Sequence, residues 1–600
     1  MTPFKTTTRQ RLGIIATACL MSVALPAAPA WAQKVKNKGA PAAETTALTS
    51  EVNVDIPTIE AVDSNVDDET LRSIFSGNVV DNAEALAGLT ATSITIPEIT
   101  MATKTTVDGE VTEATVTFND LVLTDVTDGV AATVTMAGMT ADAGDNGSAD
   151  FGALSASSLN IGGVLGMYGL VDNGQTELQT IYTDFNFEGG TFEAPEVSCT
   201  MGAVTAAQFK ARPFKYSFAE IMALAEQLEA AEDEQPSPEV LGKALRMYVD
   251  LFTAFESSPA KFGGFDCSGV DDEGSNVTFS VAGMSMEGMR PGIYPSISLD
   301  GLDIEVDGDG SVQVGNMTFK EMDLSAPIAA IEGAPEAIDE AWLTENARAL
   351  IPAFAGFSFS DVAVDVPDPE AEGERIKASV GSFDLTLGDY LNGIPTDILT
   401  SASNILVDLP ENSDDPQLQQ LIALGVTNID AGFTIDASWN EADETISVDE
   451  VSVTGANLAT IKLAGTIANA TKEIFGLDEE VALMASMGVA ISQLKLDVTD
   501  DGLSDIILAS VAAEQGSDPA TMRPVFAGLA EGTMVGLLAG AAEAQKVGAA
   551  LNAFVSGKAK YLTIEMTAKE PPGLGMMDFM AAEQDPTVLI GKVNIDATAK

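Results

Sequence analysis

Strict alternation of apolar and polar residues is the feature of this sequence that most limits its fold. In the longest run, every second residue from Ile429 to Trp439 is apolar, and a polar turn at 440–443 leads into Ile446 and Val448. A period of two places apolar side chains on one face of a β-strand and polar side chains on the other. The sequence therefore predicts antiparallel strands that each have one buried face.

The same period recurs through most of the chain. It is found at 114–118, 277–281, 297–324 and 357–387, and the run at 297–324 turns at Asp307-Gly308-Asp309-Gly310. Asp-Gly pairs supply the positive φ angles that a tight hairpin needs. Consecutive strands joined by short turns predict meander sheets.

Helical periodicity interrupts these strands in both halves of the chain. Besides a helical hairpin and a longer helical region, we expect helices at 67–89, at 335–350 and around 389–424. The predicted fold class is mainly β with helical insertions (α+β), in two related halves of antiparallel meander sheets that are curved and partly covered by helices. The predicted parts are a signal peptide (1–32), a flexible linker (33–65), an N-terminal β-rich half (66–334, with a helical hairpin at 216–257) and a C-terminal β-rich half (335–600, with a helical region at 470–556).

Residues 1–32 have the pattern of a secretory signal peptide. Basic residues at 5, 9 and 11 precede an apolar stretch at 12–25, and Ala30-Trp31-Ala32 offers a cleavage site. The apolar stretch is too short for a membrane span, so we expect cleavage and no retained transmembrane helix. The alternative, lipid attachment at Cys19, has a poorer local motif. The predicted location is the periplasm, with the cell surface as an alternative.

The chain is strongly acidic, with 90 Asp and Glu residues against 29 Lys and Arg and a formal net charge of −61. This charge repels nucleic acid and acidic lipid headgroups, favours solubility and attracts cations. Nucleic acid is therefore not an expected partner. Hydrophobic residues make up 46% of the chain, which is enough to bury a large core.

The sequence contains no histidine. This excludes Ser-His-Asp and Cys-His triads, histidine-ligated zinc or iron, and imidazole acid–base catalysis. Carboxylate pairs, Ser-Lys catalysis and oxygen-ligated calcium or magnesium stay open, but no local motif for any of them is found. We therefore expect a protein that is not an enzyme and has no cofactor, with calcium as a weak alternative.

Cys199 and Cys267 are the two cysteines outside the signal peptide. Two cysteines in an oxidising compartment most simply form one disulfide, here at the base of the helical hairpin. The chain has no Cys-x-x-Cys motif, which argues against a redox site. We predict a structural cross-link.

Four carboxylates lie close together in a predicted strand and its turn, and they are weak candidates for a metal site: Asp303, Glu305, Asp307 and Asp309. A calcium loop of the EF-hand type that starts at Asp307 needs Gly at its sixth position and Glu at its twelfth. The sequence has Val312 and Thr318 there, so the motif fails. The favoured interpretation is the solvated face of a strand that leads into an Asp-Gly turn.

Four glycines recur at every fourth position within a predicted helix: Gly528, Gly532, Gly536 and Gly540. This spacing places them on one helix face, where another backbone can approach closely. Glu531 interrupts the apolar stretch, which argues against a membrane span. The favoured interpretation is a helix packed tightly on the sheet or on a neighbouring helix. The alternative is a helix that inserts into lipid or lines a hydrophobic groove.

Two segments of the C-terminal half resemble a family of exported, uncharacterised proteins of Gram-negative bacteria. They run from Phe354-Ala355-Gly356-Phe357 to Val366-Pro367-Asp368-Pro369, and from Leu421-Ile422-Ala423-Leu424 to Trp439-Asn440-Glu441-Ala442. The resemblance covers mostly residues 350–600 and includes no catalytic motif, so it implies a structural class without an activity. In pattern alone, the long meanders also resemble AsmA- and TamB-like envelope proteins, which handle lipid in open β-lined grooves.

Export, long sheets and the lack of a catalytic motif lead to the first functional hypothesis. It is a non-catalytic periplasmic or cell-envelope protein that binds a lipid or another apolar ligand, or an envelope partner, in a β-lined groove. The alternative is a structural or adhesive surface protein that calcium stabilises. A carboxylate-dependent hydrolase ranks last, because no motif places two carboxylates together.

Overall fold

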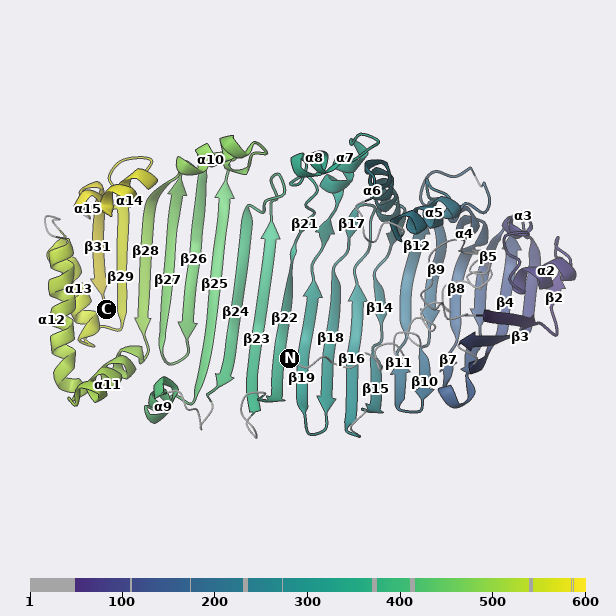
Figure 1. Ribbon diagram of the computed structural model, residues 1–600, viewed down its shortest axis with the longest axis horizontal. Helices are drawn as coiled ribbons and strands as arrows, with labels where there is room; N and C mark the ends of the chain where they lie inside the picture. The colour runs from purple at the N-terminus through teal and green to yellow at the C-terminus, as the bar shows by residue number, and fades with distance from the viewer. Residues whose placement is uncertain are drawn as a thin grey trace, which may run out of the picture. The chain divides into compact units, whose positions relative to one another are not determined.

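The computed structural model describes residues 49–600 except 108–109, 173, 230–235, 272–273, 369–374, 410–415, 539–542, 584 and 586. The predicted signal peptide and the first part of the predicted linker lie outside the described residues. The chain divides into two compact units, whose elements are labelled in Figure 1. The first comprises the chain up to Asn276 with 282–292 and 335–337, and the second comprises 277–281, 293–334 and 338–600.

Antiparallel strands form most of the first unit. Its strands are β1 (Thr49–Asp55), β2 (Glu60–Val62), β3 (Ala91–Val107), β4 (Glu110–Thr127), β5 (Val130–Met136), β6 (Gly138–Asp142), β7 (Ser148–Phe151), β8 (Leu154–Asn160), β9 (Gln179–Phe187), β10 (Gly190–Ala194), β11 (Val197–Met201), β12 (Val204–Ala211), β13 (Phe255–Ser257), β14 (Ala260–Phe262) and β15 (Phe265–Val270). Its helices are α2 (Asp68–Phe75), α3 (Ala83–Ala87), α4 (Ile161–Met167), α5 (Phe218–Glu229) and α6 (Pro238–Thr253). Strand β16 (Asn276–Met286) has residues in both units.

The start of the first unit differs from the predicted linker. Strands β1 and β2 both pair with β3, so residues within 49–62 belong to the sheet. The alternation of Val52, Val54 and Ile56 is the pattern that indicates β1. The predicted helix at 67–89 is present as α2 and α3. Asp67 caps α2 by accepting a hydrogen bond from the backbone N–H of Thr70 at 2.8 Å.

The core of this unit lies where α2 and α3 pack on the long β3–β4 pair. Leu71 of α2 and Ile94 and Ile96 of β3 are fully buried in one cluster. Helices α5 and α6 form the predicted helical hairpin. The predicted disulfide is also present, because Cys199 of β11 and Cys267 of β15 lie opposite each other with their Cα atoms 4.0 Å apart.

The second unit contains a long antiparallel sheet and a separate sheet of three short strands. Its strands are β17 (Ile293–Tyr294), β18 (Ile297–Val306), β19 (Gly310–Phe319), β20 (Met322–Asp323), β21 (Ala353–Phe354), β22 (Gly356–Pro367), β23 (Arg375–Gly388), β24 (Asp397–Asp408), β25 (Asn428–Asn440), β26 (Thr445–Gly455), β27 (Ala459–Ala468), β28 (Ala490–Asp500), β29 (Tyr561–Ala568), β30 (Leu574–Gly575) and β31 (Val593–Ala599). Its helices are α7 (Ser325–Glu332), α8 (Glu340–Glu345), α9 (Pro416–Ala423), α10 (Glu479–Met487), α11 (Leu503–Gln515), α12 (Pro519–Leu537), α13 (Ala544–Val555), α14 (Met576–Ala582) and α15 (Thr587–Lys592). Short 3-10 turns span Gly144–Asn146 in the first unit and Lys472–Phe475 in the second.

In the long sheet of the second unit, neighbouring strands pair in the order β18, β19, β22, β23, β24, β25, β26, β27, β28, β29 and β31. Because β19 pairs with β22, the meander at 297–324 belongs to the second unit, and the chain divides earlier than the predicted boundary after residue 334. The helical prediction around 389–424 is wrong at Asp397–Asp408, which form strand β24. The predicted helical region at 470–556 contains strand β28 as well as helices.

The predicted fold class is confirmed at the level of a mainly β, α+β protein with a large antiparallel sheet and several helices. The relation between the two halves stays a prediction. Within the described ranges, no helix combines the length and hydrophobicity needed to cross a membrane.

Loss of the Cys199–Cys267 disulfide should destabilise the first unit. The bridge joins residues 68 apart in the sequence, and restricting an unfolded loop of this size is worth about 4 kcal/mol in the chain-entropy model. We expect the Cys199→Ser/Cys267→Ser double variant to unfold at a markedly lower urea concentration. The control is Ser198→Ala/Ser268→Ala, a neighbouring exposed pair on the same two strands. Equal stability of wild type and the cysteine variant would contradict this role.

Candidate functional site: an open apolar sheet face

The strand register of the second unit gathers apolar side chains on one side of its sheet. Val453 lies opposite both Phe433 and Ile461 on the strands beside it. A second row crosses five strands through Val312, Val364, Ala378, Val407 and Ile429. Opposite residues in antiparallel strands point to the same side of the sheet. Both rows therefore belong to one surface, which we call the apolar face.

An extra residue in each of five neighbouring strands keeps this face apolar. Apolar positions are two residues apart along most of each strand but three apart at one row, as between Phe359 and Val362. The residues at that row have no partner in the pairing, and we call them the bulge row: Gly301, Gly315, Asp361, Gly381 and Asn404. An inserted residue reverses the phase of the alternation. All five strands have the insertion at the same row, so the apolar side chains of neighbouring strands stay on the same side of the sheet.

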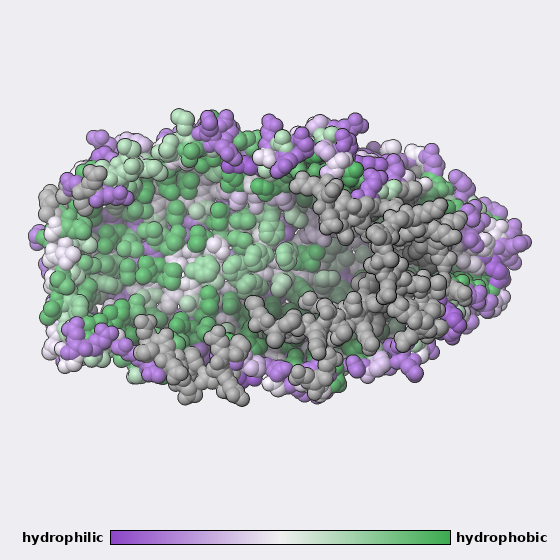
Figure 2. Space-filling model, viewed as in Figure 1, coloured by the Kyte–Doolittle hydropathy of each residue, from purple (hydrophilic) through white to green (hydrophobic). Residues whose placement is uncertain are grey.

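Much of the apolar face is open to solvent. Val453 is 60% exposed and its cross-strand neighbour Ile461 is 46% exposed. Six further residues of the face are exposed: Ile376, Val407, Ile429, Ile435, Val451 and Leu463. Figure 2 shows a field of hydrophobic residues over strands β23–β28. Large contiguous apolar surfaces are uncommon on soluble monomers and mark sites that bind lipids, ligands or proteins.

Helices cover the apolar face at its C-terminal end. Val547 and Ala550 of α13 are buried against Leu562 of β29 and Ala597 of β31. Helices α9 and α10 lie at the ends of the strands (Figure 1). Among the described residues, no buried apolar cluster joins a helix to the strands from β22 to β27. The open part of the face therefore lies over these strands.

Phenylalanines gather at the β19–β23 side of the face. The ring of Phe383 stacks on those of Phe359 and Phe357, with centroid distances of 5.0 and 5.2 Å. Phe319 continues the row and is 56% exposed. From β24 onward most side chains of the face are aliphatic. The face thus offers an aromatic region and an aliphatic region in succession.

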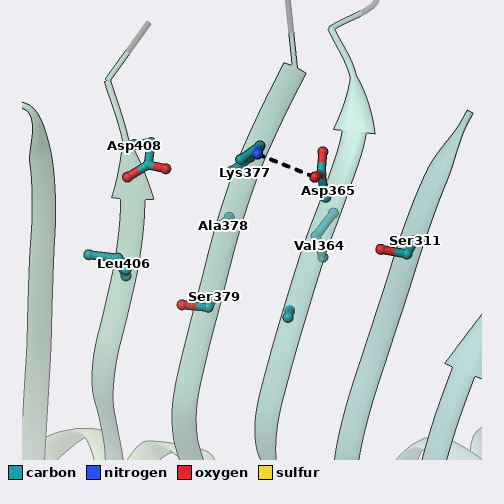
Figure 3. Close-up of a pocket in the computed structure, with 9 residues that line it drawn as sticks. Ser311, Val364, Asp365, Lys377, Ala378, Ser379, Leu406 and Asp408 are labelled. Carbon is teal, nitrogen blue, oxygen red and sulfur yellow. Dashed lines mark ion pairs between the residues drawn. The ribbon is translucent and has the colours of Figure 1, made fainter.

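The opposite face of the sheet is polar, and some of its charges are paired across strands. Lys320 contacts Asp384 at 2.7 Å. A depression of about 160 Å³ lies on this side, where Figure 3 shows Asp365 and Lys377 paired at 3.5 Å near Asp408. Ligand pockets usually measure about 300–1,000 Å³. This depression is therefore a weaker candidate than the apolar face.

Carboxylates repel one another at the centre of the polar face. Burial raises the pKa of Asp436 above its usual range, and the nearby Asp449, Asp397 and Glu450 carboxylates raise it further. Lys462 opposes this effect but pairs with Glu450. On β22, on the same polar face, a hydrogen bond from Arg375 lowers the pKa of Asp365.

The glycines predicted to form a packing face do not pack. Gly528, Gly532 and Gly536 lie on α12, and no atom lies within 4 Å of the position that a Cβ would occupy on any of them. The favoured interpretation of tight packing is wrong for these three, because α12 turns a different side toward its neighbours. The close approach occurs instead at Gly548 of α13, where a Cβ would lie 2.6 Å from Val535. Gly540 lies outside the described residues.

The four predicted metal-site carboxylates do not form a metal site. Asp303 and Glu305 lie on β18, where Asp303 accepts a hydrogen bond from the side-chain amide of Gln313 at 2.8 Å. Asp307 and Asp309 lie at the following turn. In the part of the chain that the structure describes, no group of three or more Asp, Glu or Cys side chains is arranged to hold a metal ion. The calcium-stabilised alternative stays a prediction from composition.

Comparison with known proteins adds one match. A family model described as "Uncharacterized protein" matches residues 452–600. This region lies within the stretch that resembles exported Gram-negative proteins, and the match agrees with an uncharacterised family. No curated protein and no solved structure matches the chain. The resemblance to AsmA- and TamB-like proteins stays an expectation from pattern.

Two aspartates on the polar face should have opposite effects on stability. Asp436 has a raised pKa when folded, so its ionisation destabilises the native state as the pH rises above about 4, its unfolded value. Asp365 has a lowered pKa, so its stabilising effect is present above about pH 4 and is lost as the pH falls. At pH 7, Asp436→Asn should therefore raise the melting temperature and Asp365→Asn should lower it.

Thermal melts at pH 7 and pH 3 check both variants, and both differences from wild type should shrink at pH 3. Asp443→Asn, at the exposed turn between β25 and β26, controls for the loss of one negative charge. If Asp436→Asn and Asp443→Asn shift the melting temperature equally, general charge reduction rather than local repulsion explains the effect.

Proposed function

We propose that this protein is a non-catalytic periplasmic protein that binds the acyl chains of a lipid, or a similarly elongated apolar molecule, on the apolar face of its second unit. The observation that carries the proposal is the in-register apolar surface that stays open between β22 and β27. A surface of this kind gains free energy when an apolar ligand removes it from water.

The chemistry of the face supports binding of the apolar part of a ligand. Between β22 and β27 its positions carry aliphatic or aromatic residues, glycine, and one hydroxyl at Thr400. A face without charged groups offers nothing to a phosphate or a carboxylate. A lipid headgroup is therefore expected at the ends of the strands, in water. The lack of titratable groups also favours binding over catalysis at this surface.

The dimensions of the face suit a hydrocarbon chain. Neighbouring strands are about 4.8 Å apart, so the stretch from β22 to β27 is roughly 24 Å wide. The chains of one bilayer leaflet extend over about 15 Å, half of the hydrocarbon core. Burial of a methylene group is worth about 0.8 kcal/mol, so about a dozen methylenes half covered by an open face would gain roughly 5 kcal/mol. Such binding is reversible, as transfer of a ligand requires.

Polar substitutions at the most exposed part of the face should weaken lipid binding. Val453 and Ile461 lie opposite each other on β26 and β27, so we expect Val453→Asn/Ile461→Asn to bind a fluorescent phospholipid at least about tenfold more weakly than wild type. The matched control is Thr454→Asn/Thr460→Asn, the adjacent pair on the same two strands that faces the polar side. The control should bind like wild type.

Two measurements test the proposal. Native mass spectrometry of purified protein should detect bound lipid, and titration with the fluorescent phospholipid should saturate. If no lipid copurifies and the phospholipid does not bind, the proposal is wrong. Equal weakening by the two double variants would place the lipid elsewhere on the protein.

A further inference from the structure

Two short helices of the second unit meet at the ends of its strands. Helix α10 ends just before β28, and helix α14 begins just after β30. Strands β28 and β30 pair directly, with Ala490 opposite Gly575, so the end of α10 and the start of α14 lie side by side. These helices lie at the ends of the strands, separate from the open apolar face (Figure 1).

Both helices expose apolar side chains, most of them methionines. Met577 is 75% exposed and Met484 is 71% exposed. The exposed apolar residues of α10, its preceding turn and α14 form a surface that we call the methionine rim: Leu477, Val481, Leu483, Met484, Met487, Met576, Met577, Phe579 and Met580. Methionine is a flexible and polarisable side chain that adapts to irregular apolar partners, and it is common at surfaces that bind helices.

Helix α14 buries none of its residues, although all but Asp578 are apolar. Helix α10 buries only Ala482. Helices of this length are marginal in water, and in proteins they gain most of their stability by packing an apolar side against another element. Helix α10 contacts the 3-10 turn at Lys472–Phe475 and α14 contacts α15, but the described residues leave the side chains of the rim exposed. A partner that covers the rim would supply that packing.

The charges around the rim identify the chemistry of this partner. Asp478, Glu479 and Glu480 lie at the start of α10, and no lysine or arginine forms an ion pair with them within the described ranges. At α14, Asp578 is paired with Lys592. The rim therefore combines exposed apolar side chains with net negative charge.

Three kinds of partner could cover an exposed apolar surface: a membrane, a second copy of the chain, or a helix of another protein. The negative charge of the rim disfavours the first two. Helices that lie on membranes are rich in lysine and arginine, because envelope and cytoplasmic bilayers carry anionic lipids that repel acidic groups. A second copy of the chain would bring two acidic rims together. A helix with one apolar side and flanking basic residues satisfies both features of the rim, by burying the methionines and pairing with the carboxylates.

We propose that the methionine rim is a docking surface for a basic amphipathic helix of a partner protein. The apolar side of that helix covers Met484, Met577 and Met580, and its lysines or arginines lie near Glu479 and Glu480. Docking then joins this protein to a partner at the ends of the strands, and the apolar face stays free.

A labelled synthetic peptide tests the proposal. The probe is a helical peptide of leucine and lysine with the leucines on one side, and its binding to the full chain is measured by fluorescence anisotropy. Wild type should bind it in a saturable manner, and binding should weaken as salt rises from 50 to 500 mM, about an order of magnitude in ionic strength. A peptide with glutamate in place of lysine, and one with the leucines spread around the helix, should bind much more weakly.

Substitutions locate the surface that holds the peptide. Met484→Gln/Met577→Gln/Met580→Gln should weaken binding by about tenfold or more. The matched control changes three similarly exposed apolar residues of α12: Val525→Gln/Leu529→Gln/Leu537→Gln, whose wild-type side chains are 68, 63 and 55% exposed. This control should bind within about twofold of wild type. Glu479→Gln/Glu480→Gln should bind more weakly than wild type at low salt and about as well as wild type at high salt, whereas a misfolded rim would bind more weakly at both.

Three results would overturn the proposal. The first is unchanged peptide binding in the methionine variant. The second is equal weakening by the α12 control or by Val453→Asn/Ile461→Asn, which would place the peptide on the general apolar surface or on the apolar face. The third is binding of the wild type, but not of the methionine variant, to vesicles of phosphatidylcholine alone, which would make a neutral bilayer the partner. Circular dichroism melts confirm that each variant is folded before it is scored.

Discussion

The hydrogen-bonded register of the antiparallel strands in the second unit is the constraint on which its surfaces depend. A slip of one residue between two strands would move apolar side chains from one face to the other. The bulge row shows how closely the register is kept. A Cβ on Gly315 would lie 2.8 Å from the Cβ of Asp361, and a Cβ on Gly381 would lie 2.9 Å from that of Asn404. Glycine therefore alternates with a side-chain-bearing residue along most of this row, because two adjacent Cβ atoms do not fit.

Insertions of this kind make a strand harder to predict from the sequence, although alternation predicts strands over most of the bulge row, at 297–324 and 357–387. Runs without an insertion, such as Ile429–Trp439, have a single phase, and the structure places strands there. In β24 the phase reverses between Ala402 and Ile405, and in β28 it reverses between Ile491 and Leu494. In such a strand the apolar residues are two apart on each side of the insertion and three apart across it. This mixture of spacings resembles the spacing of apolar residues in a helix. The helical prediction around 389–424 is wrong over β24, which has such an insertion.

The candidate site could be predicted only in part, for a different reason. Alternation shows that a strand has an apolar side, but whether another layer covers that side is a property of the whole fold. The β-lined groove expected from the sequence stays a prediction, and the structure has an open apolar sheet face. The residues that form it, such as Val453 and Ile461, have the same local pattern as buried ones. The methionines of α14 were missed in the same way, because a run such as Met576-Met577-Asp578-Phe579-Met580 is equally typical of a buried helix. In the structure these side chains are among the most exposed apolar residues.

Net charge connects these open surfaces to the composition of the chain. Two copies that stacked their apolar faces would bring two molecules of charge −61 into contact, and at physiological salt such repulsion acts over about 8 Å. Burial raises the pKa of Asp436, and the carboxylates around it raise it further, so crowded negative charge acts against the native state at this position. An uncharged acyl chain is not repelled by this field, and a basic helix is attracted to it. The acidic composition thus discriminates among apolar partners: it opposes self-association at the open face and is compatible with the two kinds of ligand that we propose.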